Sequence, residues 1–287
     1  MKNFVPPPHP GAPMTDRIGR QNFNALAKYI FETAGIRMPP SKQTMLEGRL
    51  RRRQRAVGAE TLDDYCDYLF DEDNIEVESE YLINAVTTNK TDFFREPYHF
   101  DYLRDVALPE LLAQGVTNLR AWSVACSNGA EPYTIAMVID DWLRGRLAAN
   151  YKVLATDLDT SMLEIARTGI YPAEFVDPVP AELRRRYLMA STDPDRDVVR
   201  VTPTLRRNVA FARLNLMDGQ YPVGEPMQLV FCRNVLIYFD RETQLRVVGQ
   251  LVEQLAPGGL LFLGHSETIA GHDLPIVQVA NTIFRRS

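Results

Sequence analysis

Two acidic side chains stand where a carboxylate could hold a small ligand. Asp157 directly follows the apolar run Tyr151–Thr156, and Glu131 follows the run Leu119–Val124 and the loop 125–129. A carboxylate at the end of a strand can accept hydrogen bonds from both hydroxyls of a ribose. Glu131, at the start of a predicted helix, could accept an ammonium group, or it could only complement the helix dipole.

The loop before Glu131 contains a single glycine, Gly129. A dinucleotide site would need a G-x-G-x-x-G loop, which brings the backbone close to the diphosphate. A loop with one glycine suits a ligand without a diphosphate, and S-adenosylmethionine is such a ligand. A ribose-binding acid at Asp157 is common to S-adenosylmethionine and nicotinamide sites, so it does not distinguish them. Asp159 could instead serve as the cap of the helix that follows.

Strands and helices alternate after about residue 117, which predicts an α/β fold with a doubly wound, Rossmann-like parallel sheet. The predicted strands are 119–124, 151–156, 228–232 and 260–264, with a hairpin at the sheet edge within 276–284. The predicted helices are 132–143, 162–167 and 243–255. Ligands bind beyond the carboxyl ends of such strands, and this edge is where Glu131 and Asp157 are expected.

The stretch from 171 to 213 interrupts that alternation, because its prolines exclude a long crossover helix. We interpret it as a small antiparallel β-subdomain with a short helix near 181–188. Residues 197–202 and 208–215 are expected to be neighbouring strands of this insertion.

The first third of the chain shows helical spacing and no strand pattern, which predicts a small all-helical domain over 14–88. Its helices are expected after Phe23 with a stop at Gly35, from Ser41 to Gly58, after a capping box at Thr61 and Asp64, and over 76–86. The proline-rich segment 1–13 is expected to be a disordered leader, and the catalytic domain is expected to span 89–287.

Four motifs occur in an order that resembles one family. They are Asn89-Lys-Thr91-Asp-Phe93-Phe94-Arg95-Glu96, Trp122-Ser-x-Ala-Cys-Ser-x-Gly-x-Glu131-Pro-Tyr133, Phe231-Cys-Arg233-Asn234-Val-Leu-Ile-Tyr238-Phe-Asp240 and Gly264-His265-Ser266-Glu267. Together they resemble the CheR family of chemotaxis-receptor methyltransferases over nearly the whole chain. The resemblance implies an enzyme that transfers methyl groups from S-adenosylmethionine to glutamate side chains on the cytoplasmic helices of chemoreceptors, leaving S-adenosylhomocysteine.

The resemblance also implies roles for individual residues. Those expected to contact the cofactor are Asn89, Thr91, Arg95, Glu131, Asp157, Asn215, Leu216, Arg233 and Asn234. Tyr238 is expected to face the methyl group and to offer a neutral hydrogen bond to the substrate carboxylate. Arg95 or Arg233 is expected to position the substrate or the cofactor carboxylate. Alternatively, Tyr238 is a core tyrosine, while Phe93, Phe94 and His265 are more readily explained by packing and structural hydrogen bonds.

A basic cluster in the helical domain offers a docking surface. Arg49, Arg52 and Arg53 share one face of the predicted helix, and acidic receptor helices would be steered toward it by charge. The alternative is an ordinary solvated basic face. Capture of a receptor's C-terminal tail by the β-subdomain is doubtful, because the loop Ala190–Asp197 lacks the glycines that tail-binding members carry.

Composition excludes several classes of function and partner. A net charge of −5 argues against a nucleic-acid partner. No apolar run reaches the roughly 18 residues that span a bilayer, and no signal peptide is evident, so we expect a cytoplasmic monomer. Three scattered cysteines and four unpaired histidines predict no metal site. Three alternatives are weaker: a methyltransferase for nucleic acids or small molecules, a cofactor-binding adaptor without catalysis, and a nicotinamide oxidoreductase.

Overall fold

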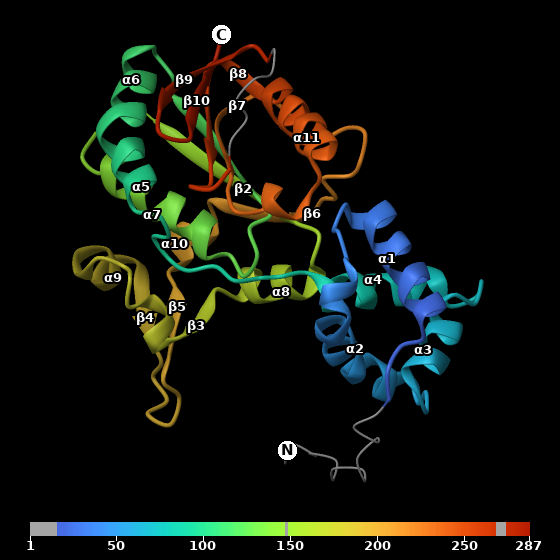
Figure 1. The fold of residues 1–287 in the computed structure, drawn as a ribbon. Helices are drawn as coiled ribbons and strands as arrows, with labels where there is room; N and C mark the ends of the chain where they lie inside the picture. The colour runs from blue at the N-terminus through green and yellow to red at the C-terminus, as the bar shows by residue number, and fades with distance from the viewer. Residues whose placement is uncertain (1–15, 147–148, 268–273) are drawn as a thin grey trace. The chain divides into compact units, whose positions relative to one another are not determined.

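The computed structural model describes residues 16–146, 149–267 and 274–287 (Figure 1). The chain divides into two compact units, Met1–Thr87 and Thr88–Ser287. The expected leader at 1–13 lies outside the described residues.

The first unit consists of helices α1 (Arg20–Ala34), η1 (Pro40–Lys42), α2 (Gln43–Val57), α3 (Leu62–Leu69) and α4 (Ile75–Val86). The predicted helix stop is confirmed, because Gly35 adopts a φ of 69° and its N–H bonds to the carbonyl of Phe31. The capping box between Thr61 and Asp64 is also confirmed.

Helices α2 and α4 are joined by a buried charge pair. Glu78 is only 1% exposed. Its carboxylate accepts hydrogen bonds from Nε and Nη2 of Arg53 at 2.6 and 2.7 Å. The hydroxyl of Tyr65 on α3 donates to the same carboxylate at 2.9 Å. Three helices therefore meet at one carboxylate, which a single guanidinium neutralises.

The second unit is built on a seven-stranded sheet. Its strands are β1 (Asn118–Val124), β2 (Asn150–Asp157), β6 (Val209–Arg213), β7 (Met227–Cys232), β8 (Leu255–Leu263), β9 (Ile276–Ala280) and β10 (Ile283–Arg286), in the order β6-β2-β1-β7-β8-β10-β9. The first five pair in parallel along this order, and β10 runs antiparallel to β8 and β9. The predicted α/β architecture and its terminal edge hairpin are confirmed.

Helices cover both faces of this sheet (Figure 1). One core contains side chains from α5 (Tyr98–Tyr102), the π-helical turn η2 (Leu103–Ala107), α6 (Leu108–Ala113) and α7 (Ala130–Leu143). The other contains side chains from α11 (Arg241–Glu253). Strand residues alternate between the two cores: Leu229 and Phe231 of β7 belong to the first, and Val230 and Cys232 to the second. The parallel direction of the first five strands places their carboxyl ends at one edge of the sheet.

The remaining elements form a small antiparallel layer after α8 (Thr160–Thr168). They are β3 (Ile170–Pro172), η3 (Ala173–Val176), α9 (Ala181–Tyr187), β4 (Leu188–Ala190), β5 (Val198–Val201) and α10 (Pro203–Arg206), with strand order β3-β5-β4. Both pairings of β5 are antiparallel. The predicted antiparallel insertion is thus present between β2 and β6.

One predicted strand pairing is wrong. Residues 197–202 and 208–215 were expected to be neighbours, but β5 lies in the small sheet, whereas β6 pairs in parallel with β2 from Val153↔Val209 to Asp157↔Arg213. The physical reason is that α10 separates the two strands and that Val209 and Phe211 pack into the core of the large sheet. The alternating pattern of β6 was recognised correctly, but it does not specify a partner.

Among the described residues, no helix is both long and apolar enough to cross a membrane.

Candidate active site at the carboxyl ends of the parallel strands

The loop after β1 has an unusual backbone that Gly129 makes possible. Ala125, Ser127 and Gly129 all have positive φ, of 52°, 50° and 91°. A Cβ on Gly129 would lie 2.8 Å from the Cβ of Ala166 on α8, which is closer than carbon atoms can approach. Glycine is therefore required here both for its conformation and for its size. The loop ends at α7, which begins at Ala130 and carries Glu131 in its first turn.

Asp157 ties this loop to the end of β2. Its Oδ2 accepts the N–H of Ser127 at 2.7 Å, and its Oδ1 accepts the N–H of Asp159 at 2.8 Å. Burial raises the pKa of Asp157 to about 6, although these two N–H bonds oppose the shift. A carboxylate offers about four lone-pair positions, so the backbone bonds do not use all of them. At pH 7 Asp157 is mostly ionised and keeps acceptor capacity for a ligand.

Asp159 has the capping role that the sequence left open. Its Oδ1 accepts the N–H groups of Ser161 and Met162 at the start of α8, at 3.0 and 3.2 Å. Its Oδ2 accepts Nδ2 of Asn89 at 2.7 Å. The carbonyl of Asn89 in turn accepts the hydroxyl of Ser127 at 3.0 Å. Asn89 is therefore held between the loops that follow β1 and β2.

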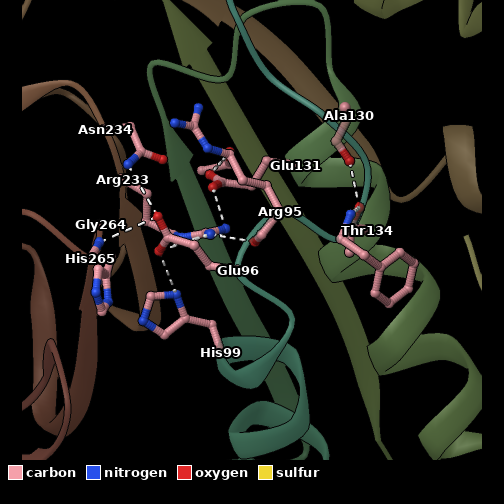
Figure 2. Close-up of polar contacts among 12 residues, drawn as sticks. Arg95, Glu96, His99, Ala130, Glu131, Thr134, Arg233, Asn234, Gly264 and His265 are labelled. Atoms are coloured by element: carbon pink, nitrogen blue, oxygen red, sulfur yellow. Dashed lines mark hydrogen bonds and ion pairs between the residues drawn. The ribbon is translucent and has the colours of Figure 1, made fainter. Parts of the chain in front are cut away.

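A charge cluster links the start of α7 to the end of β7 (Figure 2). Nη1 of Arg233 lies 3.1 Å from Oε2 of Glu131, and Nη2 lies 3.2 Å from Oε2 of Glu96. Nη2 also donates to the carbonyl of Arg95, and Oε1 of Glu131 accepts the hydroxyl of Ser123 at 2.7 Å. The side chain of Arg233 is only 2% exposed. One guanidinium therefore serves two carboxylates, and the three groups together carry a charge of −1 when all are ionised.

The two carboxylates respond differently to this environment. Burial raises the pKa of Glu131, and Arg233 and Ser123 only partly oppose it. Burial would also raise the pKa of Glu96, but Arg233, the side chain of Asn234 and the backbone N–H of His265 hold it below its ordinary value. Glu96 is therefore the firmly ionised partner of Arg233.

His99 lies next to Glu96 at the lower end of this cluster in Figure 2, and it is neutral. Its ring is fully buried, with Nε2 3.1 Å from the hydroxyl of Thr282 and Nδ1 3.5 Å from Oε2 of Glu96. Burial, followed by the nearby charge of Arg233, lowers the pKa of His99 to about 3. At neutral pH it therefore contributes packing and polar contacts without charge.

The expected contacts of Arg233 with a ligand stay a prediction, and the structure shows which protein groups it binds. The sequence suggested that it faces substrate or the cofactor carboxylate, whereas its guanidinium is buried between Glu96 and Glu131. The guanidinium of Arg95 is different, because it donates to the carbonyl of Lys90 at 2.9 Å and is partly exposed. Of the two arginines, Arg95 is the one whose side chain remains accessible to a ligand.

The other predicted site residues occupy neighbouring loops of the same unit. Leu214 after β6 donates its N–H to the carbonyl of Asp157 at 3.0 Å, which brings Asn215 and Leu216 beside the end of β2. Thr91 is half-buried in the segment before α5, and Tyr238 is half-buried at the end of the turn η4 (Leu236–Tyr238). The predicted cofactor residues thus come from five segments of one unit.

The predicted docking arginines belong to the other unit and do not form one open face. Nη1 of Arg49 donates to the carbonyls of Val86 and Thr87 at the end of α4, at 2.6 and 2.7 Å. Arg53 is bound to Glu78 and lies over the ring of Tyr81. Arg52 is exposed, and no described residue forms an ion pair with it. Arg49 and Arg53, which are four residues apart, thus both pack against α4. Helix spacing alone does not show which face of a helix is covered.

Several contacting residues were missed. Ser123, Ser127 and Glu96 bind the predicted residues directly, yet the sequence analysis gave them no role. Glu96 is the last residue of a recognised motif, directly after Arg95. That position could have marked it as a site residue. No group of three or more His, Cys, Asp or Glu side chains that could hold a metal occurs within residues 16–146, 149–267 and 274–287.

The donor set fits S-adenosylmethionine. Carboxylates with unused lone pairs suit ribose hydroxyls and an ammonium group, and the negative Glu96–Arg233–Glu131 cluster suits a cofactor whose sulfonium leaves it with one net positive charge. The loop has one glycine and lacks the G-x-G-x-x-G pattern of a dinucleotide site.

Comparisons with known proteins identify the family of the chain. A family model described as "CheR methyltransferase, SAM binding domain" matches residues 89–284, and one described as "CheR methyltransferase, all-alpha domain" matches residues 21–87. Chemotaxis protein methyltransferase of Escherichia coli is 40% identical over 96% of this chain and 94% of its own. Chemotaxis protein methyltransferase 2 of Pseudomonas aeruginosa is 36% identical over 92% of each chain.

The steric role of Gly129 can be tested against a matched glycine. We expect Gly129→Ala to destabilise the second unit by about 1–3 kcal/mol more than Gly115→Ala, because overpacking against Ala166 adds to the backbone strain. Gly115 also has a left-handed φ but open space around it. Tryptophan fluorescence during denaturation reports this unit alone, since Trp122 and Trp142 both lie in it. Equal losses would show that Ala166 does not restrict the loop.

Proposed function

Because this chain belongs to the CheR methyltransferase family, we propose that its S-adenosylmethionine-dependent methyl transfer is directed to glutamate side chains of chemoreceptors, forming methyl esters. The observation that carries the proposal is the match of both units to this family, together with relatives named as chemotaxis protein methyltransferases. The carboxylates at the strand ends support it, because they form the donor set that such a cofactor needs.

We assign the two ends of the cofactor to the two carboxylates predicted from the sequence. Asp157 would accept the ribose hydroxyls with the lone pairs that its backbone bonds leave free. Glu131 would accept the ammonium group. Two carboxylates share one guanidinium in this cluster, so the ammonium group would balance its net negative charge. Asn215 and Leu216 would flank the adenine from the loop after β6, and Asn89, Thr91 and Asn234 would line the cleft.

The bound cofactor supplies an electrophilic methyl group on a sulfonium. A substrate glutamate has an ordinary pKa of about 4.3, so it is already a nucleophile at pH 7 and needs no general base. Opposite charges are lost as the methyl group moves, and strong pairing with the reactant carboxylate would raise the barrier. Orientation can supply roughly 7–11 kcal/mol instead. We propose that Tyr238 orients the carboxylate through a neutral hydrogen bond and that Arg95 steers it without a tight ion pair.

For docking, the structure narrows the candidate cations on α2. Arg49 and Arg53 are engaged with α4, and Arg51 is paired with Asp16. Arg55 is exposed like Arg52, but its Nε donates to the carbonyl of Arg51. We therefore propose that Arg52, which is exposed, is the main charge that meets an acidic receptor helix. The loop between β4 and β5 contains no glycine and has a local turn, in which Oδ1 of Asp193 accepts the N–H of Asp195 at 3.0 Å. We propose direct docking rather than capture of a receptor tail.

The function is tested with radiolabelled S-adenosylmethionine and membranes that contain chemoreceptors. We expect base-labile label on the receptor, as a glutamate methyl ester requires. Tyr238→Phe is expected to lower turnover at least tenfold while calorimetry shows unchanged cofactor affinity. Absence of receptor label with the wild-type protein would refute the substrate assignment, and unchanged turnover in Tyr238→Phe would refute the role of its hydroxyl.

The pKa of Asp157 predicts how cofactor affinity depends on pH. The ribose hydroxyls need an ionised acceptor, so binding favours the charged carboxylate. Affinity should be highest well above pH 6 and should fall as the pH drops through the pKa of Asp157, about 6. Titration calorimetry between pH 5 and 8 should show this decline in the wild-type protein. Asp157→Asn should bind weakly at every pH in this range. A wild-type affinity that does not change with pH would argue against this contact.

The docking proposal predicts a salt dependence. Arg52→Glu should raise the KM for receptor several-fold at low ionic strength, with a smaller effect at high salt, because salt screens exposed charges. Lys28→Glu is the matched control, since Lys28 is an exposed cation on α1 of the same unit. Equal effects of the two variants would indicate a general charge effect and no specific docking site.

A further inference from the structure

The motif Gly264-His265-Ser266-Glu267 has no role in the function described so far. In the structure its glutamate is buried, with only 4% of the residue exposed, although it belongs to a loop. Among the described residues no cation forms an ion pair with it. A buried carboxylate without a cation must be satisfied by hydrogen bonds, or its burial would cost several kcal/mol.

Backbone amides supply those bonds. Oε2 of Glu267 accepts the N–H of Gly264 at 2.6 Å and the N–H of Asn234 at 2.9 Å, and Oε1 accepts the N–H of Leu236 at 2.7 Å. Burial raises the pKa of Glu267, while these amide bonds lower it part of the way. One carboxylate therefore fastens the loop after β8 to the loop after β7.

The amides of Asn234 and Leu236 are those that the β7 loop cannot satisfy by itself. Asn234 has a φ of 59°, in the left-handed region. Leu236 begins the short turn η4, and Val235, the residue before it, provides no side-chain cap. The turn ends at Tyr238, whose N–H bonds to the carbonyl of Val235 at 3.2 Å. The carboxylate of Glu267 thus takes the place of a missing cap at the start of the turn that carries Tyr238.

Gly264 is required by the same arrangement. A Cβ at this position would lie 2.6 Å from Nδ2 of Asn234, 2.8 Å from its backbone N and 2.8 Å from Oε2 of Glu267. All three atoms belong to the contact between the two loops. The glycine and the glutamate of the motif therefore serve one purpose, which is to let the carboxylate reach the amides of the neighbouring loop.

We propose that Glu267 is a positioning residue for methyl transfer, which holds the 233–238 loop, and through it Tyr238, in the geometry for reaction. The proposal rests on the function proposed above for the role of Tyr238. Arg233 and Asn234 have a second support, since Glu96 binds both of them. Nε2 of Gln244 donates to the carbonyls of Leu236 and Phe239 on either side of Tyr238, but it binds none of the amides that begin the turn. Those amides depend on Glu267, and Tyr238 lies two residues after Leu236. Loss of Glu267 should therefore affect turnover more than cofactor affinity.

Two substitutions separate the hydrogen bonds from simple packing. Glu267→Gln keeps the size of the side chain but turns an amide NH₂ toward backbone N–H groups, which repel it. Glu267→Asp keeps the carboxylate but shortens its reach by one methylene. We expect kcat to fall in the order wild type, Asp, Gln, with a loss of at least tenfold for Gln and a cofactor affinity within about threefold of wild type. If packing were the role, Gln would resemble the wild-type protein and Asp would be worse, and this order would overturn the proposal.

A double-mutant cycle tests whether the effect passes through Tyr238. If it does, Glu267→Gln should cost little further turnover in a Tyr238→Phe background. Independent, multiplicative losses would refute the link to Tyr238. Glu47→Gln is the matched control, because Glu47 is also a buried glutamate that accepts a backbone N–H, from Ile18 at 3.1 Å, but lies in the helical unit. Its kcat should be that of the wild-type protein once the folded fraction is measured.

Amide hydrogen exchange tests the contact without any substrate. The N–H groups of Asn234 and Leu236 should be protected in the wild-type protein and exchange at least tenfold faster in Glu267→Gln. Equal exchange in the two proteins would overturn the proposal. If the wild-type protein fails to label receptors while this difference in exchange is present, the substrate assignment fails and the positioning contact stands.

Discussion

The site depends on a single guanidinium that lies between two carboxylates. Arg233 follows β7, Glu131 begins α7, and Glu96 belongs to the segment before α5, so this one contact joins three parts of the unit. Removing the cation would leave two buried carboxylates with only neutral donors, a change that typically costs about 3–5 kcal/mol. Keeping it leaves a net negative cluster. The same interaction therefore holds the segments together and creates the charge that suits a cationic cofactor.

A second constraint is that the loops at this edge have irregular backbones whose amides need acceptors. Asp157, Asp159 and Glu267 each accept two or more backbone N–H groups from the loops after β1, β2, β7 and β8. Buried amides outside helices and sheets must find such partners. The acidic residues of the site thus stabilise the loops by binding their amides. Those with unused lone pairs can also bind a ligand.

The sequence was sufficient where a local pattern determines the structure. Strand runs followed by Glu131 and Asp157 predicted the sheet edge, since parallel strands place their carboxyl ends together. It was insufficient where the answer depends on a partner far along the chain. Nothing near Arg233 indicates that Glu96 neutralises it, and the alternation of Val209 and Phe211 does not reveal that β6 pairs with β2.

The arginines predicted to dock the receptor show that a helical pattern, too, does not reveal its packing partner. The spacing of Arg49 and Arg53 correctly indicates one face of α2, but the carbonyls of Val86 and Thr87 and the carboxylate of Glu78 decide that this face is covered. Hydrogen bonds to the end of a helix are favourable for a cation because the helix dipole is negative there. A run of arginines therefore divides into structural and free members only when the packing partner is known.

The fate of Arg233 also bears on the chemistry. A methyl transfer from a sulfonium to a carboxylate destroys charge, so an accessible arginine that paired tightly with the substrate would stabilise the reactants more than the transition state. Burial between Glu96 and Glu131 prevents Arg233 from making that pair. The groups that we propose to orient the substrate are therefore the neutral hydroxyl of Tyr238 and the partly exposed Arg95, whose guanidinium is bonded to the carbonyl of Lys90. A site that holds its strongest cation away from the nucleophile is suited to a reaction in which orientation, rather than charge stabilisation, lowers the barrier.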